Sequence, residues 1–277
     1  SQSRTSLQDS GAMAGYKAGR GFFLSSQNGS FTMNITGQLQ TRFVMSKVKD
    51  ETGGVNAGFN TNKTDWGFQV RRAKIRFQGN VVDKTWHYKI DGSFVDSDGD
   101  AGGFEFQEAT IGHDVNDNVT VSFGQFKTPF NREELVSSEN QLAVERSLVN
   151  QYFNADRMVG MNLTYATDAW RLNAAYGNGF RTAYNFDYTN TSSADNPTRW
   201  SAAARLDYKI SGDWASFDSF TSSPDSEEAM MFGVAVQGQA WNGEFAGAVS
   251  DDLTMMGVTA DFSMKMAGLS IFGAVIY

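Results

Sequence analysis

The stretch FTMNITGQLQTRFVMS, residues 31–46, decides the fold. Its odd-numbered positions are mostly apolar from Phe31 to Met45, whereas its even-numbered positions carry polar side chains such as Gln38 and Arg42. Alternation of this kind predicts a β-strand with one apolar and one polar face. Strands of globular proteins usually have about 5–6 residues, so alternation over sixteen residues indicates an unusually long strand.

The same alternation recurs along the chain and predicts eleven strands in all. The ten further segments are Trp66–Phe77, Trp86–Phe94, Phe104–His113, Val119–Phe123, Val159–Tyr165, Trp170–Tyr176, Trp200–Lys209, Met230–Gln239, Met256–Met264 and Leu269–Tyr277. Within the first of these the apolar parity switches across Arg71–Arg72, which predicts a β-bulge. Aromatic residues recur at strand ends on the apolar face, where the interfacial girdles of a membrane barrel would need them. These residues are Trp66, Trp86, Tyr165, Trp170, Tyr176, Trp200 and Tyr208.

The connectors between these strands alternate between long and short ones, except at residues 210–228. Residues 47–63 and 127–157 are long connectors, and residues 79–84 and 114–117 are short ones. This alternation is typical of outer-membrane barrels, which have extracellular loops on one rim and periplasmic turns on the other. The predicted fold is therefore all-β, a transmembrane antiparallel up-and-down β-barrel. A soluble β-sandwich or lipocalin-like barrel is the alternative, although its strands would be shorter and its aromatic residues would lie inside.

The composition favours an all-β chain and excludes several functions. Phe occurs 22 times and Leu 11 times, and aromatic residues favour strands whereas Leu favours helices. The net charge of −8 argues against a general nucleic-acid binder, which needs a basic surface. The sequence has no Cys and two His, and it lacks the G-x-S-x-G, P-loop and H-E-x-x-H motifs of common enzyme classes. We therefore predict no catalytic residue, no metal site and no cofactor.

The two ends and two loops give further expectations. No stretch approaches 18 consecutive apolar residues, so no transmembrane helix is predicted. Residues 1–20 are polar and glycine-rich, without the apolar region of a signal peptide, and we expect them to be flexible and periplasmic, with residues 21–277 forming the barrel. Asn28-Gly29 lies between two strand-like runs and predicts a hairpin. Residues 96–100 resemble the start of a calcium loop, but Ala101 and Gln107 stand where Gly and Glu are needed, which favours a solvated extracellular loop.

Four segments of the sequence are similar to a known family. They are GFFLSSQNGSFTMNITGQLQTRF (21–43), FQVRRAKIRFQGNVVDKTWHYKIDGSF (68–94), VTVSFGQFKTPFNREELVSSENQLAVERSLV (119–149) and RWSAAARLDYKISGDWASFDSF (199–220). The run GQFKTPF followed by EEL, SS and ERS is the most specific part. Together these segments resemble the phosphate-selective porin O and P family, over nearly the whole chain from residue 21.

The resemblance implies a sixteen-stranded barrel in the outer membrane of a Gram-negative bacterium. Such porins are usually homotrimers that contact membrane lipid and lipopolysaccharide and pass small anions such as phosphate. The resemblance also implies that the third extracellular loop, here residues 127–157, folds into the lumen. Because the sequence stops inside the eleventh predicted strand, about five strands are expected to lie outside it. The net charge of −8 is a departure from what an anion channel suggests.

The residues that could select ions should lie on the polar face of the strands. The cations of that face are Arg42, Arg72, Lys74, Arg76, Lys89, Arg171, Arg205 and Lys209, and the acids are Asp91, Glu108, Asp207 and Asp261. Eight cations against four acids predict a net positive lumen, and arginine suits oxyanions because its planar fork offers two parallel donors. The alternative is that each cation is paired structurally with a lumen carboxylate.

The long connector 127–157 should constrict the lumen, because connectors of that length in a compact fold are usually functional. Its cations include Lys127, Arg132 and Arg146. The near-helical spacing of Leu135, Leu142, Val144 and Leu148 predicts a short helix packed on the inner wall. The chief hypothesis is passive diffusion of small hydrophilic solutes with a preference for anions. The alternatives are a general or cation-favouring porin and, from another class, a soluble β-barrel ligand-binding protein.

Overall fold

The computed structural model describes residues 11–17, 21–47, 64–95, 101–180, 198–241, 244–245, 248–249 and 253–277. It contains one sheet of thirteen strands, in which each strand is antiparallel to its neighbours, and a separate two-stranded ribbon. The sheet consists, in order, of β1 (Ala12–Lys17), β2 (Gly21–Ser26), β3 (Thr32–Lys47), β4 (Thr64–Val81), β5 (Asp83–Val95), β6 (Ala101–Asn116), β7 (Val119–Lys127), β8 (Arg157–Ala166), β9 (Trp170–Gly177), β10 (Thr198–Ser211), β11 (Ala229–Trp241), β14 (Leu253–Met266) and β15 (Leu269–Ile276). The ribbon pairs β12 (Glu244–Phe245) with β13 (Ala248–Val249).

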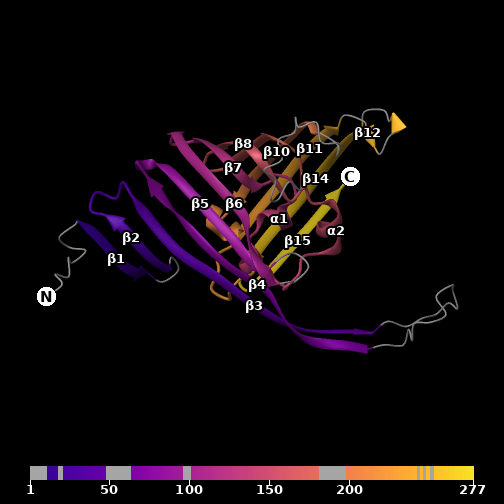
Figure 1. The fold of residues 1–277 in the computed structure, drawn as a ribbon, viewed down its shortest axis with the longest axis horizontal. Coiled ribbons are helices and arrows are strands. Elements are labelled where there is room, and N and C mark those ends of the chain that lie inside the picture. The colour runs from indigo at the N-terminus through magenta and orange to yellow at the C-terminus, as the bar shows by residue number, and fades with distance from the viewer. Residues whose placement is uncertain are drawn as a thin grey trace.

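The sheet curves into an open trough, with the short helices α1 (Arg132–Leu135) and α2 (Leu148–Phe153) on its concave side (Figure 1). Two 3-10 turns complete the described helical structure, η1 (Ser138–Asn140) and η2 (Trp214–Asp218). β1 and β15 form the two edges, and in the described residues they do not pair with each other. None of the helices in the part of the chain that the structure describes is long and apolar enough to cross a membrane.

The strand predictions are confirmed, with two additions. The eleven predicted strands correspond to β3–β11, β14 and β15, and the sheet also contains β1 and β2. The Asn28-Gly29 hairpin is confirmed between β2 and β3, and Gly29 has the positive φ of 68° that such a turn requires. The expectation of a flexible N-terminal segment is wrong for Ala12–Lys17, which forms β1 and pairs with β2. The candidate calcium segment, residues 96–100, lies outside the described residues.

The predicted bulge is confirmed in β4. Gln40 of β3 pairs with Arg72, but the next residue, Thr41, pairs with Val70, so that Arg71 is the extra residue. A bulge changes which face the following side chains occupy. It therefore explains why the apolar parity of the sequence switches at this point.

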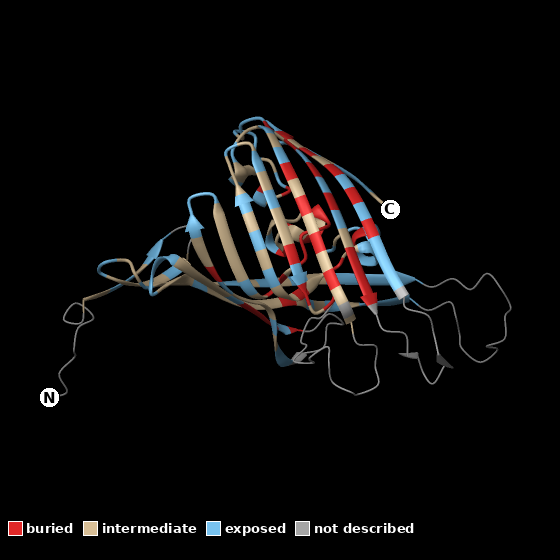
Figure 2. Cartoon of the chain, turned by 90° about the horizontal axis from the view of Figure 1, so that it is seen from above, coloured by how far each residue is buried: buried red, intermediate tan, exposed pale blue. Residues whose placement is uncertain are grey.

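Burial in the sheet is inverted relative to a soluble barrel. Figure 2 shows bands of buried and exposed residues alternating along the strands, and in β14 Met256 and Val258 are 74% and 50% exposed whereas Thr259 and Asp261 are 1% and 5% exposed. The apolar residues lie on the convex face; for example, Phe68 is 85% exposed. In a soluble barrel the hydrophobic effect would place these residues inside. The arrangement is that of a transmembrane barrel, whose outer face is apolar and whose interior is polar.

Residues 128–156, which we call the connector, join β7 to β8 and lie against the polar, concave face of the sheet (Figure 1). The side chain of Asn131 accepts a hydrogen bond from the Glu133 amide and caps α1, and Ser147 caps α2 by accepting from the Asn150 amide at 3.0 Å. The expected single helix is wrong, because these two short helices are separated by η1 and an irregular stretch. Leu148, expected on the inner wall, is 71% exposed.

Candidate functional site

Three polar cavities lie between the concave face and residues 128–156. One, of about 530 Å³, is lined mainly by β3, β4 and β5, and another, of about 740 Å³, reaches from β4 to β10. Between β4, β7 and the connector lies a third cavity of about 200 Å³, which we call the central cavity. Its charged lining consists of seven cations (Arg71, Arg72, Lys74, Arg76, Lys127, Arg146 and Arg157) and four acids (Asp91, Glu108, Glu134 and Asp156). The formal charge around the central cavity is therefore +3.

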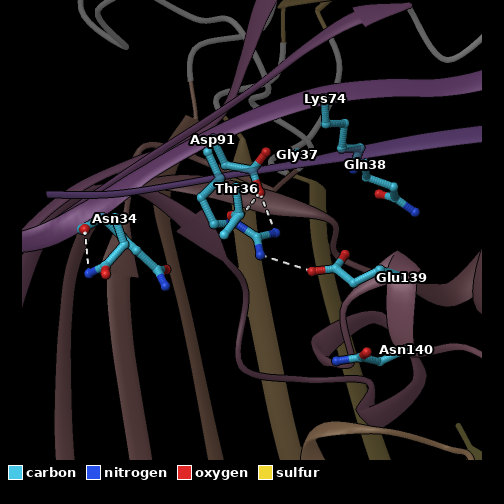
Figure 3. A pocket seen from close by; sticks show the side chains of 10 residues that line it. Asn34, Thr36, Gly37, Gln38, Lys74, Asp91, Glu139 and Asn140 are labelled. Carbon is cyan, nitrogen blue, oxygen red and sulfur yellow. Dashed lines mark hydrogen bonds and ion pairs between the residues drawn. The ribbon is translucent and has the colours of Figure 1, made fainter. Parts of the chain in front are cut away.

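Arg76 joins the sheet to the connector by binding Asp91 and Glu139, two residues that Figure 3 labels. Its Nε and Nη2 donate to Oδ2 of Asp91 at 2.9 and 2.6 Å, and its Nη1 donates to Oε1 of Glu139 in η1 at 2.8 Å. Asp91 faces Arg76 because the two residues are directly paired across β4 and β5. The carboxylates of Asp91 and Glu139 neutralise the charge of Arg76 locally. If Arg76 bound a further anion, it would share its N–H donors between that anion and these two carboxylates.

Three arginines of β3 and β4 surround the carboxylate of Glu145, a residue of the connector. Glu145 receives hydrogen bonds from Nη1 of Arg42 at 2.6 Å and from Nε and Nη2 of Arg71 at 2.5 and 3.1 Å. Nη2 of Arg72 lies 3.7 Å from Oε2 of Glu145, and its Nη1 donates to the Val144 carbonyl oxygen at 2.6 Å. We call Arg42, Arg71 and Arg72 the arginine clamp. With one carboxylate against three guanidinium groups, the clamp has a local charge of +2.

Lys74 lines both the central cavity and the 530 Å³ cavity. Its Nζ lies 3.4 Å from the Ser138 hydroxyl. Among the described residues no carboxylate lies within ion-pair distance of Lys74.

Lys127 and Arg146 hold the connector in shape. Nζ of Lys127 donates to the carbonyl oxygens of Glu134, Leu135 and Val136 at 2.9, 3.3 and 3.4 Å. Arg146 donates to the carbonyl oxygens of Glu133 and Val136, each at 3.0 Å. These carbonyls lack partners inside so short a helix as α1, and cations stabilise the C-terminal end of a helix dipole. Both residues therefore stabilise the connector while they line the central cavity.

Arg205 is only 1% exposed and lines none of the three cavities. Its five N–H donors, the full complement of a guanidinium group, bind Asp207, Asp261 and the Phe130 carbonyl oxygen at 2.6–3.2 Å. Arg205 thus fits the alternative in which a cation of the polar face is paired structurally with carboxylates. Through Phe130 it also binds the start of the connector to the sheet. Arg132 is also buried and donates to the Phe217 carbonyl oxygen, with its guanidinium 5.7 Å from the Phe220 ring centroid.

The remaining predicted cations lie towards the 740 Å³ cavity or the rim. Lys89 and Arg171 line that cavity. Lys89 binds Glu108 at 2.6 Å, and the guanidinium of Arg171 stacks over Trp214 at 4.3 Å. Lys209 binds Asp168, whose side chain is 98% exposed, at 3.1 Å.

Two carboxylates of the connector have lowered pKa values. Burial opposes ionisation of Glu139, but hydrogen bonds from the Ser137 hydroxyl and from Arg76 outweigh it and lower the pKa to about 2. Burial also opposes ionisation of Glu145, whose pKa is lowered by the hydrogen bond from Arg71 and by the charges of the arginine clamp. Both carboxylates are therefore ionised at neutral pH.

The sequence did not single out Arg71, Glu139 or Glu145 as site residues. The parity switch at Arg71–Arg72 was the available signal for Arg71, because an extra residue brings two consecutive side chains to one face. No pattern in the sequence shows which acidic residues of the connector contact the concave face of the sheet. Among the described residues no group of three or more His, Asp or Glu side chains could hold a metal ion.

The comparisons with known proteins agree with the resemblance found in the sequence. The family model for phosphate-selective porin O and P matches residues 46–239, more than two thirds of the chain. The matched range contains β4 to β10, the whole connector and every basic residue that lines the three cavities. No curated protein matches the sequence.

Proposed function

The chain belongs to the phosphate-selective porin O and P family, and we propose that it passes small hydrophilic solutes across the outer membrane by passive diffusion, with a preference for anions. The inverted burial of the sheet supports a position in the membrane, since a convex face bearing Phe68 and Met256 would be costly in water. The solutes would pass along the concave face.

The observation that carries the anion preference is the excess of cations that line the central cavity, seven against four acids. The excess stays positive when Glu139 and Glu145, which bind three of these cations, are counted as well. Like charges gathered at a constriction raise the local concentration of counter-ions. The guanidinium groups of this wall also offer paired donors that match a phosphate or another oxyanion. Lys74, as a point charge without a carboxylate partner among the described residues, adds attraction that needs no displacement of a resident acid.

The test is the reversal potential in a salt gradient across a planar bilayer. Replacing Arg72, Lys74 and Arg76 together by Gln should shift the potential towards cations. The matched control replaces three exposed lysines, Lys17, Lys47 and Lys84, by Gln, since it changes the net charge equally away from the cavities. An unchanged potential in the first variant, or the same shift in both, would contradict the proposal.

A general or cation-favouring porin is the second candidate. The observation in its favour is the extent of pairing on the concave face: Arg76 meets two carboxylates, and Lys89 meets Glu108. A reversal potential that indicates cation preference in the unmodified protein would select this candidate.

We further propose a homotrimer in the outer membrane of a Gram-negative bacterium, in contact with membrane lipid and lipopolysaccharide, as is usual for the family. Chemical cross-linking of the protein in its native membrane measures the oligomeric state. Recovery of the protein with the inner membrane, or only monomers after cross-linking, would count against this part of the proposal.

A further inference from the structure

Glu145 occupies the donors that a passing oxyanion would use. It bridges Nε and Nη2 of Arg71, a fork of parallel donors, and also takes a hydrogen bond from Arg42. A carboxylate and a phosphate present similar oxygens to such a fork. The resident side chain and a solute anion therefore compete for the same hydrogen bonds.

We propose that Glu145 is an internal counter-ion of the arginine clamp and that it sets how strongly the pathway prefers and retains anions. This inference rests on the proposed function, because it requires solutes to pass along the concave face. With Glu145 in place the clamp has a charge of +2, and without it the charge would be +3. Glu145 thereby weakens anion binding enough for a bound anion to leave, as conduction requires.

The exposure of these groups supports exchange. The Glu145 side chain is 43% exposed and that of Arg42 is 29% exposed, and ion pairs that reach water contribute little to stability. The ion pairs of Arg205 differ in this respect, because its Asp261 partner is 0% exposed and has no access to a competing anion. An anion can thus replace Glu145 without leaving a buried charge unpaired.

The connector has other attachments close to Glu145 that would remain when an anion replaces it. Arg72 holds the Val144 carbonyl oxygen at 2.6 Å, and the Ser138 hydroxyl donates to Gln38 of β3 at 2.8 Å. Glu139 is bound separately by Arg76. The exchange at Glu145 therefore concerns one side chain and leaves the path of the connector in place.

The expected effect follows from Coulomb's law. Removing one unit charge about 7 Å from a passing ion, in a medium as polar as water, changes the permeability of a monovalent ion about threefold. For a dianion the interaction energy doubles, so the change is about sevenfold. This dependence on solute charge separates a counter-ion from a side chain that merely narrows the passage, since widening would affect both anions alike.

The experiment compares the full chain with its Glu145→Gln variant in planar bilayers at pH 8. We expect the chloride-to-potassium permeability ratio to rise about sevenfold, because chloride gains about threefold and potassium loses about threefold. The inorganic phosphate concentration that halves the chloride current should also fall about sevenfold. The matched control is Glu133→Gln, which also removes one negative charge from the connector. The Glu133 carboxylate accepts its hydrogen bonds from Ser147 rather than from the arginine clamp. Equal effects in the two variants, or no effect in Glu145→Gln, would overturn the inference.

A second variant addresses the case in which Glu145→Gln detaches the connector and opens a wide, unselective channel. Gln38→Cys and Ser138→Cys, joined by a short thiol-reactive cross-linker, fix the connector to β3, and the chain has no other Cys to react. A charge-dependent effect of Glu145→Gln in this background supports the inference, and its absence overturns it.

If the unmodified protein prefers cations, the proposed anion pathway fails. If it prefers anions but Glu145→Gln behaves as the control does, only the present inference fails.

Discussion

Replacing Arg205 by Met should destabilise the folded chain by about 3–5 kcal/mol, the range measured when one partner of a buried ion pair is removed. Met has a similar length but no charge and no donors. The variant would leave two carboxylates, Asp207 and Asp261, whose side chains are 10% and 0% exposed, without their shared cation. It would also release the Phe130 carbonyl oxygen, which Arg205 binds at 3.0 Å.

The magnitude is smaller than the sum of the bonds that are lost. The four hydrogen bonds to carboxylates alone, at about 1.5–3 kcal/mol each, would add up to more. Burying the guanidinium group itself costs several kcal/mol, however, and this cost disappears with the side chain. The net loss therefore comes mainly from the two carboxylates, which are left close together in a site from which water is excluded.

The assay is urea-induced unfolding of the protein in lipid vesicles, followed by the difference in gel migration between folded and unfolded chains. The control variant combines Arg205→Met with Asp207→Asn and Asp261→Asn, which removes all three charges and should recover at least half of the loss, since no unpaired ion remains. A loss below about 1 kcal/mol for the single variant would refute the reasoning. So would a triple variant that is less stable than the single one.

Three further outcomes are expected. Val236→Arg places a charge on the convex face, where Val236 is 52% exposed, and should cost about 2–4 kcal/mol in a bilayer; a neutral effect on urea unfolding in vesicles would show that this face does not contact lipid. Gly233→Ala should destabilise the fold, because the added Cβ would lie 2.0 Å from Nη2 of Arg205, and unchanged unfolding would mean that Arg205 can move aside. Because folding lowers the pKa of Glu145, its ion pairs stabilise the connector above the ordinary pKa of 4.5 and are lost as the pH falls through the lower, folded-state value. The difference in reversal potential between the unmodified protein and Glu145→Gln should therefore persist at pH 4.5, and its disappearance there would contradict the lowered pKa.

The strands and their faces could be predicted because alternation records directly which side of the sheet each residue occupies. The bulge in β4 could be predicted for the same reason, from the parity switch at Arg71–Arg72. β1 could not be predicted, because it is only six residues long and its sequence, AMAGYK, combines small and apolar residues without alternation. The two helices of the connector could not be predicted, because its apolar residues have a helical spacing but do not form one buried helical face, and Leu148 is exposed.

The role of each cation could not be predicted from its position on the polar face. Arg205 and Lys74 have the same place in the alternation, yet one is enclosed by two carboxylates and the other lines two cavities without such a partner among the described residues. The difference arises from contacts between residues distant in the sequence, such as the 56 positions that separate Arg205 from Asp261. Strand register determines which of these residues meet, and register is a property of the folded sheet.

The bulge at Arg71 links the membrane position of the sheet to its charge. In a regular strand Arg71 and Arg72 would point to opposite faces. One of them would therefore lie on the apolar, convex face, where an arginine at the bilayer centre costs about 2–4 kcal/mol. The extra residue brings both side chains to the concave face, where both approach Glu145. One irregularity of the backbone thus keeps a charge off the lipid-facing surface and adds it to the arginine clamp.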